Sequence, residues 1–209
     1  MRPGRIVALL ALPLMLAACG GPAEPVWAPD AAVRAAAYHD GPPEIRLYTV
    51  VSVRNGSGAH SGLLINAGQR VLFDPAGSFQ MKSLPERNDV LYGITDDALK
   101  VYIDYHARKD FNVVEERIPV TMEQAMLAQH LAEQYGAVPK AQCSLAITRI
   151  LHQIPGFETM PVSWFPGKTE HWFGTLPGAT RRVITDDDAD KNYHARLVPR
   201  GFAVSAQPG

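Results

Sequence analysis

Three segments rich in β-branched and aromatic residues follow one another closely in the first half of the chain. They cover residues 45–53, 60–66 and 69–74, and glycine-containing turns at 55–58 and 67–68 separate them. This composition is typical of strands, and short loops with glycine join neighbouring strands as hairpins. The spacing therefore predicts a mainly antiparallel sheet, which limits the chain to folds whose core is built on such a sheet.

Further strands are expected in the second half of the chain. Residues 99–106 alternate between apolar and polar side chains, which predicts a strand, and residues 111–118 have strand composition. The chain from Phe157 onward is rich in proline, glycine and aromatic residues, and we expect it to form loops and short strands.

Two helices are expected to pack on the sheet. Thr121 and Gln124 have the spacing of a capping box, which predicts a helix over residues 122–135. A second helix is predicted over residues 142–154, because apolar residues recur on one face and a Pro-Gly pair follows. The predicted fold class is therefore α+β, with an antiparallel sheet packed against helices.

The amino terminus has the pattern of a secretory signal. Arg2 and Arg5 precede an apolar stretch from Ile6 to Leu16 that is too short to span a bilayer. Its end, Leu16-Ala17-Ala18-Cys19, resembles the bacterial lipobox. This resemblance implies cleavage after residue 18 and acylation of Cys19. Gly20 follows in place of aspartate, which favours anchoring in the outer membrane, on its periplasmic side.

The chain is thus expected to divide into three regions. Residues 1–18 are the lipoprotein signal peptide, residues 19–43 are the lipidated cysteine with a proline-rich flexible tether, and residues 44–209 are one folded domain. Hydrophobic residues make up 46% of the chain and the net charge is −1, which excludes a wholly disordered protein. Without an excess of basic residues, nucleic acid is not an expected partner.

Lipidation of Cys19 would leave Cys143 as the one free thiol, because the sequence has two cysteines. Cys143 falls in the first turn of the predicted helix, where backbone N–H groups and the helix dipole favour thiolate over thiol. A histidine within reach would complete an activated nucleophile. Of the seven histidines, His60 is favoured because it opens a predicted strand directly after a glycine-rich turn.

Three stretches around these residues resemble NlpC/P60-type papain-fold hydrolases. They are His60-Ser61-Gly62-Leu63-Leu64-Ile65, Val71-Leu72-Phe73-Asp74-Pro75-Ala76-Gly77 and Gln142-Cys143-Ser144-Leu145. Histidine precedes cysteine here, as in the circularly permuted branch that includes lecithin:retinol acyltransferase-like proteins. The resemblance implies a permuted papain-like architecture, Cys143 as nucleophile, His60 as general base and a third polar residue that orients the imidazole.

Asp74 is our choice for that third residue, because it ends the strand expected to pair with the strand of His60. Asp74 also precedes Pro75, where an aspartate that only forms a turn is common. His171 and His194 remain alternative partners for the thiol; the position of His194 after the cysteine suits the unpermuted order.

Other features have simpler interpretations. The acidic run from Asp186 to Asp190 lacks the glycine and glutamate of a calcium loop, and a solvated loop is favoured. Trp164, Phe165, Trp172 and Phe173 either line a substrate groove or cover the edge of a core. No cysteine–histidine cluster or glycine-rich phosphate loop is present in the sequence, so we expect no metal and no cofactor.

The sequence thus predicts a membrane-anchored periplasmic thiol hydrolase or acyl or peptidyl transferase. Its expected partners are the lipid bilayer and a cell-envelope substrate, either a peptidoglycan peptide or an acyl lipid, cleaved at an amide, peptide or acyl bond. The alternative is a non-catalytic envelope lipoprotein that uses a papain-like cleft for binding or structural support.

Overall fold

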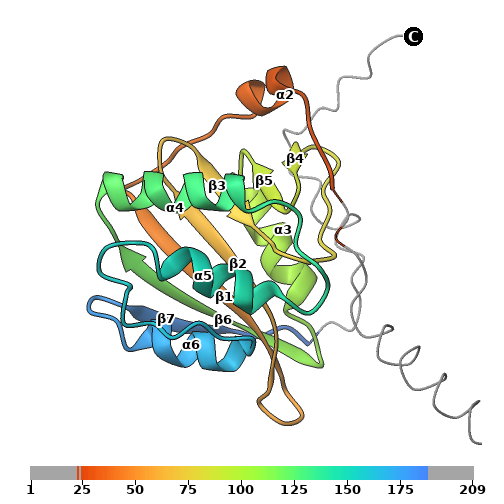
Figure 1. The fold of residues 1–209 in the computed structure, drawn as a ribbon. Coiled ribbons are helices and arrows are strands. Elements are labelled where there is room, and N and C mark those ends of the chain that lie inside the picture. The colour runs from red at the N-terminus through yellow and green to blue at the C-terminus, as the bar shows by residue number, and fades with distance from the viewer. Residues whose placement is uncertain (1–22, 24, 188–209) are drawn as a thin grey trace, which may run out of the picture.

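The computed structural model describes residue 23 and residues 25–187. These residues form one seven-stranded antiparallel sheet in the order β4-β5-β3-β2-β1-β6-β7, with helices on both sides (Figure 1). The strands are β1 Glu44–Ser52, β2 Gly58–Asn66, β3 Arg70–Phe73, β4 Glu86–Arg87, β5 Val90–Tyr92, β6 Phe111–Pro119 and β7 Thr180–Ile184. The helices are α2 Asp30–Ala35, α3 Asp96–His106, α4 Met122–Tyr135, α5 Cys143–Leu151 and α6 Pro166–Gly174. The predicted α+β class with an antiparallel sheet is therefore confirmed.

Strands β1 and β2 form the centre of the sheet. They differ in how much of their length is paired with the strand on their outer side. β1 pairs along its whole length with β6. β2 pairs with β3 only from Leu63 to Asn66, opposite Phe73 to Arg70. Residues 58–62 of β2 therefore extend past the end of β3. This overhang is where the candidate site forms.

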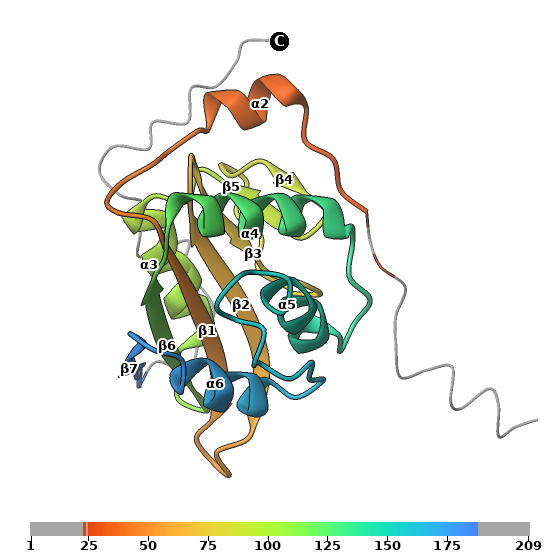
Figure 2. The ribbon, with the colours of Figure 1, turned by 60° about the vertical axis from the view of Figure 1, so that its left-hand side comes forward.

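The two faces of the sheet carry separate cores. Leu63 and Ile65 of β2 face α4, α5 and α6, and belong to a large cluster with residues of those helices. Leu64, on the opposite face, packs in a second cluster with Tyr102 and other residues of α3. Figures 1 and 2 show α3 on one side of the strands and α4, α5 and α6 on the opposite side. The alternation of side chains along a strand explains the division.

The strand predicted over residues 99–106 is wrong, because these residues belong to α3. Thr95 caps this helix, since its hydroxyl accepts a hydrogen bond from the backbone N–H of Ala98, and two aspartates occupy the first turn. Leu99, Tyr102 and His106 recur at helical spacing and are buried. The apolar residues of 99–106 therefore fit both a strand pattern and one face of a helix. The N-terminal cap at Thr95 favours the helix.

The other predicted elements are present with small shifts at their ends. The capping box of Thr121 and Gln124 starts α4, which covers residues 122–135 as predicted. The predicted second helix is shorter and ends at Leu151. Helix α6 was not expected, because its sequence is rich in aromatic residues and glycine; it begins with Pro166 at a position where proline favours a helix start.

The segment before β1 contacts the edge of the sheet. Trp27 forms a β-bridge with Arg87, and its ring lies against the Arg87 guanidinium. The side-chain amide of Asn66 donates to the carbonyl oxygens of Asp40 and Pro42. No helix within residues 25–187 is long and apolar enough to cross a membrane. The lipobox and Cys19 lie outside the described residues.

Candidate active site

Cys143 is the first residue of α5, and its side chain is only 6% exposed. Hydrogen bonding to the His60 imidazole and to the backbone of Ser61 and Ser144 lowers the pKa of its thiol, so these groups lie beside the sulfur. Ser61 belongs to the overhang of β2, so the start of α5 lies against the part of β2 that β3 does not cover. The apolar face of α5 holds this position, because Ile147, Ile150 and Leu151 are fully buried in the core.

His60 and Asp74 meet because of the register of β2 and β3. Leu63 pairs with Phe73, so Gly62 stands opposite Asp74, and His60 shares a face of the sheet with Gly62. His60 Nε2 lies 2.7 Å from Asp74 Oδ1. The carboxylate therefore accepts a hydrogen bond from Nε2, and Nδ1 is the ring nitrogen that this bond leaves available. The structure thus brings together Cys143, His60 and Asp74, in the order expected for a nucleophile, a base and an orienting carboxylate.

The charges of these three groups support one another. Burial opposes the charged form of His60, but the neighbouring Asp74 carboxylate outweighs it and raises the pKa of His60 to about 10. Burial likewise opposes ionisation of Asp74, and His60 overcomes it to hold the pKa of Asp74 below its usual value. Burial also disfavours the Cys143 thiolate, yet the His60 hydrogen bond and charge lower the pKa of Cys143. These shifts all act in favour of a thiolate–imidazolium pair.

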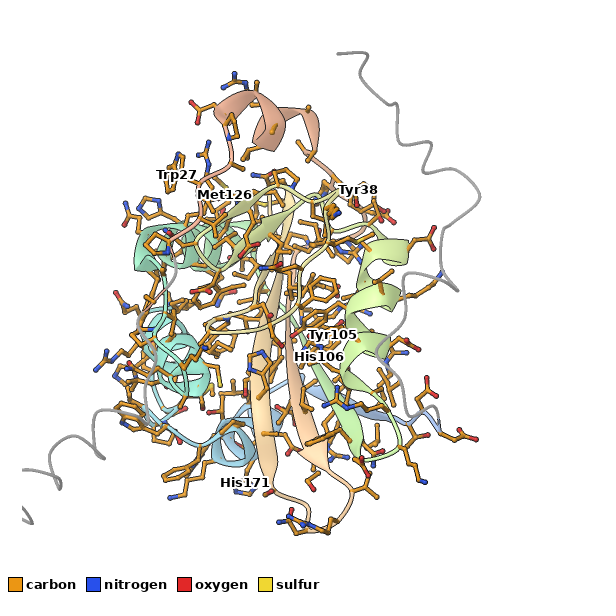
Figure 3. All side chains as sticks on the ribbon, turned by 90° about the vertical axis from the view of Figure 1, so that its right-hand side faces the viewer. Trp27, Tyr38, Tyr105, His106, Met126 and His171 are labelled. Atoms are coloured by element: carbon orange, nitrogen blue, oxygen red, sulfur yellow. The ribbon has the colours of Figure 1, made fainter. Side chains whose placement is uncertain are left out.

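Tyr102 and His106 of α3 complete the surroundings of His60 and Asp74, on the face of the sheet opposite α5. The Tyr102 hydroxyl donates to Asp74 Oδ1 at 3.0 Å. The His106 ring stacks on His60 with centroids 5.5 Å apart, and its Nδ1 donates to the Tyr102 carbonyl at 2.9 Å. Burial lowers the pKa of His106 to about 4, so this imidazole is neutral beside the charged one. Figure 3 shows His106 extending from α3 toward the strands.

Sequence reasoning missed Tyr102 and His106, because it placed both on a strand. The signal that could have found them was local: Thr95 followed by two aspartates is an N-terminal helix pattern, and Leu99, Tyr102 and His106 then share one face. Their position over His60 depends on α3 packing against the sheet.

The alternative residues of the sequence analysis lie elsewhere. His171 is exposed on α6 with its ring against Trp172. His194 lies outside the described residues, as does the end of the acidic run beyond Asp187. Phe173 is buried in the core, whereas Trp164, Phe165 and Trp172 are exposed. Helix α6 borders the site, because the hydroxyls of Thr169 and Ser144 form a hydrogen bond.

Three groups of the site could also act as metal ligands. The ligand atoms of His60, Asp74 and His106 all lie within 4.8 Å of one another. Two of these ligand atoms already bind each other, because Nε2 of His60 donates a hydrogen bond to Oδ1 of Asp74. Nδ1 of His106 is likewise hydrogen-bonded, to the Tyr102 carbonyl.

The close approach of Tyr102 to the site leads to a prediction for Gly62. A Cβ atom at this position would lie 2.1 Å from the Tyr102 hydroxyl oxygen. We expect Gly62→Ala to displace Tyr102 from Asp74 and to lower the free energy of unfolding by about 1–3 kcal/mol, measured by urea denaturation. Gly68→Ala is the control, because a Cβ there meets no atom within 4 Å. Equal stability of the two variants would contradict the described packing of Tyr102.

Comparisons of the chain with protein families, with characterised proteins and with solved structures found no match. The functional argument therefore depends on the geometry and electrostatics of the site itself.

Proposed function

We propose that the protein is a cysteine hydrolase or acyl or peptidyl transferase whose nucleophile is Cys143. The observation that carries the proposal is the 2.7 Å hydrogen bond between His60 Nε2 and Asp74 Oδ1, next to a helix-start cysteine whose pKa the same imidazole lowers. A buried carboxylate, an imidazole and a thiol at a helix start are the parts that nucleophilic acyl transfer needs, and the pKa shifts of all three favour the charged forms that the reaction uses.

The proposed reaction has two steps. The Cys143 thiolate attacks a carbonyl carbon, and the oxygen takes up the negative charge near the backbone N–H of Cys143. When the carbonyl re-forms, the bond to the leaving nitrogen or oxygen breaks, and the His60 imidazolium gives its proton to that atom. Water or an acceptor with an amine or hydroxyl then attacks the thioester. His60 takes the proton of this second nucleophile, and the Cys143 thiolate leaves.

Asp74 and Tyr102 act through His60 in this scheme. Asp74 holds the tautomer and orientation of the imidazole and stabilises its charged form. The Tyr102 hydroxyl fixes the carboxylate in turn, because burial raises the pKa of Tyr102 well above its usual value and keeps the hydroxyl a donor.

The fold is compatible with a permuted papain-like architecture, which we propose as the finer description. In support, His60 lies on a central strand of an antiparallel sheet and precedes Cys143, which heads a helix packed on that sheet. The sequence motifs around His60, Asp74 and Cys143 give the same assignment.

We further propose that the protein is anchored in the outer membrane through acylated Cys19 and acts on the cell envelope. The mature protein is expected to begin at Cys19 and to fractionate with membranes, and mass spectrometry of its amino terminus measures this directly. Cys19→Ser is expected to release the protein without unfolding it. An unmodified Cys19 in the native protein would contradict the anchor and leave the site chemistry unaffected.

Trapping of the acyl intermediate tests the reaction. The protein is incubated with p-nitrophenyl esters of short acyl chains and quenched in acid, and intact mass then shows whether one acyl group is attached. We expect acylation of Cys143 in wild type and none in Cys143→Ala, with the same fold by circular dichroism. A thiol that forms no acyl adduct would instead support the non-catalytic lipoprotein.

A further inference from the structure

A pocket of about 220 Å³ lies beside His60, on the side of α3. Its polar lining comes from His60, Ser78, Tyr105, His106 and Arg108, and small or apolar residues such as Phe111 complete it. Figure 3 shows Tyr105 and His106 on the part of α3 that faces the strands here. The volume is below the range of pockets that enclose drug-sized ligands, so the pocket has room for a small group of a larger substrate.

Arg108 is the permanent positive charge of this pocket, and the fold holds it in place. Its backbone N–H and carbonyl form a pair of hydrogen bonds with Phe111, both of 2.8 Å. Its guanidinium lies 4.7 Å from the centre of the Phe111 ring, and Nη1 donates to the Tyr105 carbonyl at 3.2 Å. These contacts use neutral partners and leave other N–H groups of the fork for a ligand.

The charge of Arg108 has no counterpart within the described part of the chain. The ion pairs among residues 25–187 involve other basic residues and not Arg108, and none of the residues lining the pocket is acidic. Hydroxyl groups of Ser78 and Tyr105 lie 3.0 Å apart on the same wall. The Asp74 carboxylate beyond His60 is already engaged by His60 and Tyr102. A half-buried guanidinium next to hydroxyls, with no carboxylate in the lining, is a setting that favours an anionic ligand.

We infer that this pocket recognises a carboxylate on the substrate, close to the bond that Cys143 attacks, and that Arg108 is the residue that binds it. The inference rests on the proposed function, because His60 belongs to both the pocket and the triad. A planar carboxylate fits the fork of an arginine through two parallel hydrogen bonds. The expected substrate class is accordingly a peptide or amino-acid amide with a free carboxylate beside the scissile carbonyl. The small pocket disfavours a long acyl chain at this position.

Matched alkylating agents test the inference without a known substrate. Iodoacetate is anionic and iodoacetamide is neutral, and the two are nearly equal in size. Chloroacetylglycine and chloroacetylglycinamide form a second such pair, in which the carboxylate of the anionic reagent lies further from the reactive carbon. Rates of Cys143 modification are measured by intact mass at low salt, in protein that carries Cys19→Ser so that a single thiol is present. The quantity of interest is the ratio of the rate with the anionic reagent to the rate with the neutral one.

We expect Arg108→Gln to lower this ratio about tenfold for at least one reagent pair; because the ratio compares two reagents on the same variant, a general change in thiol reactivity cancels. Arg54→Gln is the control, because it removes the same charge from an exposed position outside the pocket. An unchanged ratio in Arg108→Gln, or an equal fall in Arg54→Gln, would overturn the inference. Slow reaction with every reagent in wild type would instead contradict the proposed function.

A binding measurement distinguishes failure of the carboxylate inference from failure of the proposed function. In Cys143→Ser, N-acetylglycine is titrated against the protein, and the ring C–H signals of His60 and His106 are followed by NMR. We expect saturable shifts with N-acetylglycine, none with N-acetylglycinamide, and loss of the shifts in Arg108→Gln. If the acid and the amide act alike, the pocket does not select a carboxylate, whether or not the thiol is reactive.

Discussion

Replacement of His60 by alanine is expected to abolish the low-pH reactivity of Cys143. In wild type, the His60 hydrogen bond and charge lower the pKa of the thiol against the opposing effect of burial. Without the imidazole, burial still opposes the thiolate and only the backbone groups of Ser61 and Ser144 still favour it, so the pKa of Cys143 rises. Since each pKa unit changes the thiolate fraction tenfold, we expect alkylation by iodoacetamide at pH 6 to slow by about a hundredfold or more.

The measurement is a pH profile of alkylation between pH 4 and about 10, again in a background with Cys19→Ser. His130→Ala serves as the control, because His130 is exposed on α4 and outside the site. We expect its profile to match that of wild type. If His60→Ala retained fast alkylation at pH 6, the thiolate would not depend on His60 and the triad would be wrong.

Replacement of Asp74 by alanine is expected to cause the largest loss of stability at the site. Asp74 is buried and accepts hydrogen bonds from both His60 and Tyr102, so the variant leaves an imidazolium and a hydroxyl without their partner. Breaking a buried ion pair in this way costs about 3–5 kcal/mol of unfolding free energy. Asp97→Ala is the control, since Asp97 forms an exposed pair with Lys100 and is expected to lose less than about 1 kcal/mol.

The pH dependence of this loss follows from the pKa shifts of the pair. The folded pKa of His60 is raised from 6.5 to about 10, so its contribution is complete below 6.5 and is lost as pH rises through about 10. The pKa of Asp74 is lowered from 3.8, so its contribution is present above that value and is lost at lower pH. The stability difference between wild type and Asp74→Ala is therefore expected to be largest between about pH 4 and 6.5. A difference that grew toward pH 10 would contradict the ion pair.

Local sequence patterns determined much of the sheet and the two helices behind it. The β-branched segments that became β1 and β2 are strongly biased toward extended backbone, and the capping box of Thr121 satisfies helix N–H groups without help from distant residues. The same local reasoning placed Cys143 at the start of a helix and His60 on a strand. These positions follow from short-range propensity and turn chemistry, which the sequence contains in full.

Residues 99–106 show where local reasoning failed. Their apolar residues fit both a period of two and a helical face, and packing against the sheet, together with the Thr95 cap, selected the helix. Helix α6 similarly depends on burial of Phe173 and on the hydrogen bond between Thr169 and Ser144. Such contacts join residues far apart in the chain, and no local pattern records them.

The sequence by itself determined that this protein has an antiparallel sheet, a cysteine at a helix start and seven candidate imidazoles. Only the tertiary structure decided which imidazole meets the thiol. The short β3 leaves residues 58–62 of β2 uncovered, α5 fills that space with Cys143, and α3 holds Tyr102 and His106 against the other side. The physical reason is that strand register and helix packing are set by burial of the whole core. Neither property belongs to any single segment.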